Sequence, residues 1–189
     1  MIRGIHHVAI AVRRLSDAYH LYRDLFGLPL VKEAAIADQG VRAALLAAGD
    51  SEIELLEPLD ANGGVARFLA RYGEGLHHVC FETEDVGAEL TAAKDKGAEL
   101  IDATPRPGLA GQIGFLHPRA CAGVLVELAT IDVAGSRTHA TPAPSATPAP
   151  SANVARSQHP SGLRFKRLII GAEEPRATAS IFQRLFGFP

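Results

Sequence analysis

The sequence predicts an α+β fold in which two βαβββ modules share one cupped, mixed β-sheet. The segment GIHHVAIAV at 4–12 returns as GLHHVCFET at 75–83, and both copies are typical of an apolar strand that begins with two histidines. Each copy is followed by one helical pattern and then by three strand-like segments. A unit repeated in this way is expected to form two equivalent halves of one core.

The first module covers about residues 1–63. Its first strand is expected at 5–12, and apolar residues at helical spacing predict a helix at 16–27. Ser16 is the expected N-cap of that helix, and Gly27 is expected to end it. The remaining elements of this half are three strands and a connecting helix, predicted at 28–38, 41–49, 51–58 and 63–73.

The second module covers about residues 74–131 and repeats this order. A strand is expected at 76–83 and a helix at 85–97, and three further strands are expected at 98–107, 111–118 and 123–130. The two modules together form the predicted domain, residues 1–133.

The composition changes after this domain. Residues 134–162 are rich in Pro, Ala, Ser and Thr and contain TPAPSA twice in a row, which predicts a disordered linker. Residues 163–189 are typical of folded protein again. The stretch 165–189 aligns without a gap on 5–29 and carries Arg167 in place of a histidine. We therefore expect the strand and helix that begin a further, truncated module.

Composition also restricts the class of function. The formal net charge of −2 argues against a general nucleic-acid binder. No apolar run reaches the roughly 18 residues of a membrane span, and no signal peptide is evident, so we expect no membrane partner. The two cysteines do not form a disulfide framework, which is typical of a reducing, cytoplasmic location.

The repeat places polar residues at matching positions. Glu54 follows His7 by 47 positions, and Glu127 follows His78 by 49. Any one of these residues alone is more typical of an ordinary polar position on a strand. Two matched pairs within apolar strands instead indicate a site for a divalent first-row metal, because buried carboxylates need a cation or a partner. Strict alternation along a strand points His6 and His77 to the other face, and they are not expected to take part.

The chain resembles the vicinal oxygen chelate superfamily, which includes glyoxalase and bleomycin-resistance proteins. Within it, the resemblance is strongest to the methylmalonyl-CoA epimerases. It covers about 2–129 and rests on the segments HHVAIAV, YRDLFGLPL, QGVRAALLAAGDSEIELLEPL, FLARYGEGLHHVCFET and PRPGLAGQIGFLHPRACAGVLVEL. The blocks IELLEP, GEGLHH and FLHP are more specific to the epimerase branch than to the fold.

The resemblance implies an isomerase that inverts C2 of methylmalonyl-CoA through a metal-stabilised enolate. It implies one divalent ion held by His7, Glu54, His78 and Glu127, with Co²⁺ expected first and Mn²⁺, Ni²⁺ or Zn²⁺ as alternatives. Inversion needs a base on each face of the planar intermediate. The family supplies the last-strand glutamate, here Glu127, and a glutamate whose place is taken by Asp38. For Asp38, a turn residue before Gly40 is an equal alternative.

Other functions remain open at this point. A glyoxalase I-type lyase, or another metalloenzyme of the superfamily, uses a similar intermediate. A non-catalytic small-molecule binding protein is less expected, because that class typically lacks the four ligands. Arg106 and Arg119 are candidates for contact with the phosphates of an acyl-CoA, although each alone is more typical of a surface arginine. A homodimer is the candidate oligomer.

Overall fold

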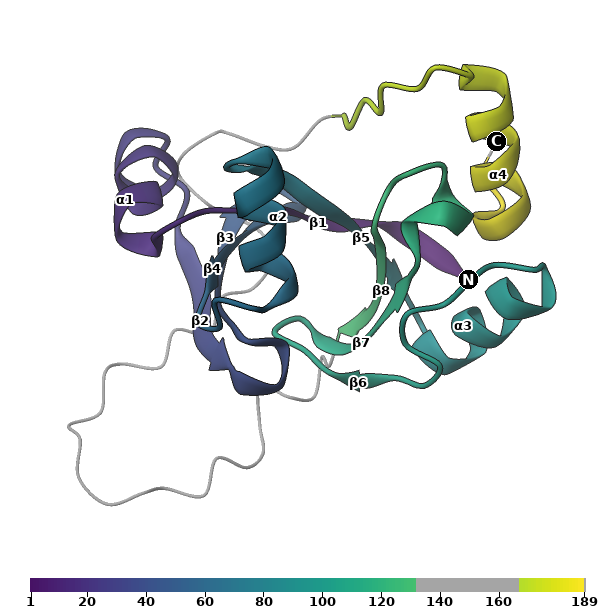
Figure 1. Ribbon diagram of the computed structural model, residues 1–189, viewed down its shortest axis with the longest axis horizontal. Helices are drawn as coiled ribbons and strands as arrows, with labels where there is room; N and C mark the ends of the chain where they lie inside the picture. The colour runs from purple at the N-terminus through teal and green to yellow at the C-terminus, as the bar shows by residue number, and fades with distance from the viewer. Residues whose placement is uncertain (132–166, 189) are drawn as a thin grey trace.

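The computed structural model describes residues 1–131 and 167–188. Within these ranges the strands form one eight-stranded sheet in the order β2-β3-β4-β1-β5-β8-β7-β6. Figure 1 shows the two halves of this sheet curling toward each other. The strands are β1 (Ile2–Ala11), β2 (Leu30–Ile36), β3 (Val41–Ala48), β4 (Ser51–Pro58), β5 (Gly75–Thr83), β6 (Arg106–Pro107), β7 (Gly111–Leu116) and β8 (Val126–Ile131).

The strand pairing is the same in both halves of the sheet. The first strand of each module runs parallel to the last, β1 beside β4 and β5 beside β8. The other neighbours within each module are antiparallel. The modules meet where β1 lies antiparallel to β5. This arrangement confirms the predicted class, a cupped mixed sheet built from two βαβββ modules.

The helices lie at the expected places, with one difference in the first module. They are α1 (Leu15–Tyr19), α2 (Gly64–Tyr72), α3 (Val86–Asp95) and α4 (Pro175–Phe186). The predicted helix at 16–27 is α1 followed by a π-helical stretch, His20–Leu25. The predicted N-cap was wrong. Arg14 occupies that position without a side-chain cap, and Glu57 from β4 accepts the Leu15 N–H instead, at 2.7 Å.

The strand predicted at 98–107 is mostly absent. Only Arg106–Pro107 forms a strand, with one isolated bridge nearer the start of the segment. Prolines cannot donate to a strand ladder. The Asp102 carboxylate takes the place of part of the ladder, because its Oδ2 accepts the Phe115 N–H at 3.0 Å and its Oδ1 accepts from Arg106 Nε at 3.0 Å.

Apolar side chains divide between the two faces of the sheet. The outer face of each module packs under helices, α1 in the first and α3 with α4 in the second. The concave face of the first module is lined by small and aliphatic residues under α2, among them Ala9, Ala11 and Ala43. Figure 1 shows α1 and α3 at opposite ends of the molecule. The outer faces therefore carry most of the core, which leaves the concave face available for polar groups.

Helix α4 docks against the second module. Phe182 and Leu185 are buried in the same cluster as Phe81 of β5. Lys96 Nζ, just after α3, donates to the Leu185 carbonyl at 2.9 Å. Residues 167–172 before the helix form no strand. The predicted linker at 134–162 lies outside the described residues, and the further module within 163–189 stays a prediction. None of the helices in the described ranges has both the length and the hydropathy of a membrane span.

We predict that Leu185→Ala releases α4 from the second module. Leu185 is 2% exposed, and a Leu-to-Ala change in a core costs about 2–5 kcal/mol. That loss is a large share of the free energy that docking of one helix contributes to stability. Hydrogen exchange should accelerate in α4 and remain slow in β1 and β5. The matched control is Gln183→Ala on the exposed side of the helix. Unchanged protection of α4 in Leu185→Ala would contradict the docking.

Candidate metal centre

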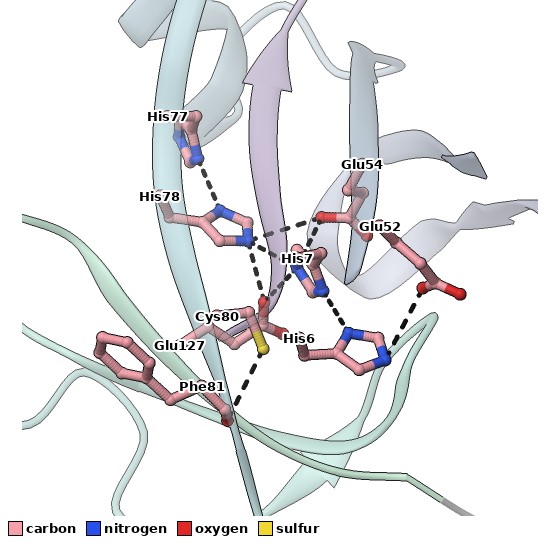
Figure 2. Close-up of polar contacts among 9 residues, drawn as sticks. All are labelled: His6, His7, Glu52, Glu54, His77, His78, Cys80, Phe81 and Glu127. Carbon is pink, nitrogen blue, oxygen red and sulfur yellow. Dashed lines mark hydrogen bonds and ion pairs between the residues drawn. The ribbon is translucent and has the colours of Figure 1, made fainter. Parts of the chain in front are cut away.

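Four side chains from four strands meet on the concave face of the sheet. They are His7 of β1, Glu54 of β4, His78 of β5 and Glu127 of β8 (Figure 2). All four are buried, with exposed fractions of 0–6%. Nε2 of His7 lies 3.0 Å from Glu127 Oε2 and 3.5 Å from Glu54 Oε2, and Nε2 of His78 lies 2.9 and 3.5 Å from the same atoms.

Strand register brings these four residues together. Across the β1–β5 junction, Ala9 faces His78 and Cys80 faces His7. Ala9 also lies beside Glu54 on β4, and Cys80 lies beside Glu127 on β8. Each module therefore contributes a histidine, a glutamate and a small residue, and the small residue lies between its own module's glutamate and the other module's histidine. The small residue leaves room for the imidazole from the other module.

The cluster fits a divalent cation. Glu127 Oε2 is buried between the Nε2 atoms of His7 and His78, at 3.0 and 2.9 Å, and a buried carboxylate is costly unless positive charge compensates it. The two Nε2 atoms lie 3.3 Å apart. Atoms bound at about 2.0–2.2 Å to one ion lie roughly 2.8–3.6 Å apart at neighbouring positions. The donor set of two imidazoles and two carboxylates suits a first-row metal.

The pKa shifts of Glu127 and His7 show how the charges of the cluster depend on one another. Burial raises the pKa of Glu127, but hydrogen bonds from His7 and His78 outweigh it and lower the pKa well below its usual range. Burial lowers the pKa of His7, but its interactions with Cys80, Glu54 and Glu127 outweigh burial and raise the pKa above its usual range. Two buried carboxylates thus require positive charge at the imidazole side, which is the place a metal ion would take.

The histidines that precede His7 and His78 also lie beside the cluster, contrary to the expectation from strict alternation. Nδ1 of His6 is 2.8 Å from Nδ1 of His7, and Nδ1 of His77 is 3.0 Å from Nδ1 of His78. The β1–β5 register shifts at His6 and again at His77, so each is an extra residue in its strand. A β-bulge re-aims a side chain in this way. Burial first, and then the charge of His78, lower the pKa of His77 to about 4.

A cavity of about 490 Å³ opens above the cluster. Glu54, His78 and Glu127 line it, and so does Asp38 on the wall that follows β2. The side chain of Asp38 is 64% exposed, and its Oδ2 lies 4.0 Å from Nη1 of Arg106. The structure therefore brings the second predicted base to the same cavity as Glu127, although not into the buried cluster.

The two candidate arginines, Arg106 and Arg119, differ in their position relative to the cavity. Arg106 lines it and lies over the ring of Phe115, at 5.5 Å. Arg119 does not line it, and its side chain is 77% exposed beside Glu99. Arg67 on α2 lines the cavity as well. The sequence contained no signal for Arg67, because its helical pattern shows only which face is apolar.

The comparisons define the class of protein. A model of the glyoxalase/bleomycin resistance protein/dioxygenase superfamily matches residues 6–116. The chain belongs to this superfamily, as its resemblance predicts. It is 40% identical over 123 residues to an uncharacterised protein of Bacillus subtilis, YqjC, a match that covers 65% of this chain and 88% of that protein.

The most informative relatives are epimerases. The chain is 37% identical to an ethylmalonyl-CoA/methylmalonyl-CoA epimerase of Cereibacter sphaeroides over 131 residues, which is 68% of this chain and 98% of that protein. A methylmalonyl-CoA epimerase of Streptomyces coelicolor, solved with 2-nitronate-propionyl-CoA, is 37% identical with a TM-score of 0.69. That match covers 70% of this chain and 100% of the other. The predicted similarity to methylmalonyl-CoA epimerases is confirmed.

We predict that a divalent ion stabilises the fold and that Glu127→Gln abolishes this effect. Co²⁺ at about 100 times its Kd should add about 2.7 kcal/mol to the free energy of unfolding, because it binds only the native state. Thermal unfolding with and without Co²⁺ measures the difference. Glu84→Gln, at a side chain that is 63% exposed, is the control and should keep the full shift. An unchanged Tm of the wild-type protein in the presence of each of Co²⁺, Mn²⁺, Ni²⁺ and Zn²⁺ would count against the site.

Proposed function

We propose that this protein is a metal-dependent epimerase that inverts C2 of methylmalonyl-CoA. One observation carries the proposal. Three members of the buried four-residue cluster, Glu54, His78 and Glu127, line one cavity together with a separate carboxylate, Asp38. The relatives support an isomerase of the epimerase type. The metal dependence, the bases and the acyl group are our assignments.

His7, Glu54, His78 and Glu127 would hold the ion. Cobalt is the first candidate, with Mn²⁺, Ni²⁺ and Zn²⁺ as alternatives, because imidazole and carboxylate donors accept all four. When bound, the ion supplies a Lewis acid that stabilises negative charge on the oxygens of a substrate enolate. The charges support this role, since two carboxylates and two neutral imidazoles balance a divalent cation.

Glu127 and Asp38 would act as the two bases. Inversion requires one group to remove the C2 proton and another to return a proton on the opposite side. Glu127 belongs to β8 of the second module, and Asp38 follows β2 of the first. The lowered pKa of Glu127 keeps it ionised at neutral pH. The exposure of Asp38 leaves its carboxylate free to move toward a substrate in the cavity.

The charged part of an acyl-CoA would meet Arg67 and Arg106. Both line the cavity, and guanidinium groups suit phosphates and carboxylates. Arg106 is already held by Asp102, at 3.0 Å, and extends toward Asp38. Arg119 lies outside the cavity and is not assigned a role. We expect the protein to act in the cytoplasm, and a homodimer remains the candidate oligomer.

The test is a stereochemical assay in deuterated water. Metal-loaded protein is added to one stereoisomer of methylmalonyl-CoA, and inversion and deuterium uptake at C2 are followed together. We expect both, with metal-stripped protein inactive until metal is restored. Turnover of a glutathione hemithioacetal in place of inversion would favour the glyoxalase-type lyase. Absence of inversion in a protein that binds metal would reject the proposed reaction.

We predict that Asp38→Asn lowers turnover by about 10²–10⁴-fold, the usual contribution of a general acid–base group. Metal content should not change, because Asp38 lies outside the buried cluster. Steady-state kinetics and elemental analysis of the same preparation measure both quantities. Asp17→Asn, at a side chain that is 63% exposed and paired with Arg14, is the control. A loss under roughly fivefold would remove Asp38 from the mechanism.

A further inference from the structure

The two histidine pairs have one shared geometry. In each pair the Nδ1 atoms of adjacent rings face each other, at 2.8 Å in His6–His7 and 3.0 Å in His77–His78 (Figure 2). These are hydrogen-bond distances. Two ring nitrogens can bond only if one carries the proton and the other accepts it. Each pair therefore contains one defined donor and one defined acceptor.

Which Nδ1 atom of each pair donates the proton follows from what the Nε2 atoms of His7 and His78 face. The Nε2 atoms of His7 and His78 point at the shared centre, 3.0 and 2.9 Å from Glu127 Oε2. A nitrogen that binds a metal must keep its lone pair, so a neutral imidazole carries its proton on Nδ1. That buried N–H needs an acceptor. Nδ1 of the preceding histidine lies within reach of it in both pairs, at 2.8 and 3.0 Å, and can accept it.

We infer that His6 and His77 are positioning residues, each of which accepts the Nδ1–H of the next histidine and so keeps that histidine's Nε2 lone pair available to a metal ion at the centre. The inference rests on the proposed function, because it assigns the metal to His7 and His78. Partners of this kind orient metal-binding histidines and raise their basicity. Neither His6 nor His77 is itself a ligand in this arrangement.

The backbone geometry at His6 and His77 supports a specific role for these two residues. Each positioning histidine is the extra residue of a bulge in the β1–β5 pair, at equivalent places in the two modules. A bulge interrupts the ladder, so two bulges at matching positions indicate a feature that the fold retains at a cost. The His6 and His77 rings also have contacts away from the Nδ1–Nδ1 pair. Nε2 of His6 lies 3.7 Å from Glu52 Oε2, and the His77 ring packs edge-on against Phe68 at 5.0 Å.

His77 is the better position for a test, because it lies at the cavity wall and is only half-buried. In His77→Asn the side-chain amide keeps an acceptor near the place of Nδ1, whereas in His77→Leu it is lost. The probe is Zn²⁺ alone, measured by competition with a chelator. We expect His77→Leu to bind Zn²⁺ about 10–100-fold more weakly and His77→Asn to stay within about threefold of the wild type. His20→Leu is the control at a side chain that is 82% exposed and should not change the affinity.

A spectroscopic readout separates positioning from a general loss of packing. In ¹⁵N-labelled, Zn²⁺-loaded wild type, His78 should show a protonated Nδ1 and a metal-bound Nε2. The Nδ1–H signal should persist in His77→Asn and exchange rapidly or vanish in His77→Leu. Unchanged Zn²⁺ affinity in His77→Leu, or a proton on Nε2 of His78 in the wild type, would overturn the inference.

Both readouts are independent of the reaction. They use no acyl-CoA, so a wild type that fails the stereochemical assay still tests the histidine pairs. A wild type that binds Zn²⁺ while His77→Leu binds it equally well rejects the positioning role and leaves the proposed function standing. A wild type that binds no divalent ion rejects both.

Discussion

The antiparallel pairing of β1 with β5 is the contact on which the rest of the arrangement depends. It sets Ala9 opposite His78 and Cys80 opposite His7, so the two modules interleave their polar and small residues along one line. Because side chains alternate with a period of two, a slip of one residue would turn both histidines out of the cup. Neither module alone holds more than half of the cluster. The duplicated sequence thus becomes a single site only through this register.

The same pairing determines where stability comes from. Glu54 and Glu127 are 6% and 4% exposed, and burying carboxylates costs several kcal/mol unless they are compensated. The larger share of the buried apolar side chains lies on the outer faces, under α1, α3 and α4. The concave face adds a smaller set, which includes Leu45 and Leu56 in the first module and Ile113 and Phe115 in the second. The fold therefore stabilises the sheet from outside, which allows the inside to hold charges that only a cation or protons can balance.

The sequence predicted those features that depend on repetition and strand period. The two modules, the mixed sheet and the meeting of His7, Glu54, His78 and Glu127 all follow from the matched pattern. It could not predict what depends on departures from regular geometry. His6 and His77 were assigned to the wrong face because a bulge breaks the alternation. The strand at 98–107 was overestimated because Asp102 replaces backbone bonds with its side chain. Arg67 reaches the cavity only through the tertiary placement of α2.

The two proposed bases differ in how firmly they are held. Glu127 is fixed within β8 by imidazoles from the neighbouring strands, whereas Asp38 sits on a short 3₁₀ turn after an edge strand. Arg106, whose Nη1 lies 4.0 Å from Asp38 Oδ2, belongs to the other module and is itself held by Asp102 and Phe115. An aspartate is one methylene shorter than the glutamate of the family pattern. As the proposed second base, Asp38 would recover the lost reach by movement of the turn, through a water or through a different seating of the substrate. Of these three, movement is the one that the 64% exposure of Asp38 and its 4.0 Å separation from Arg106 favour.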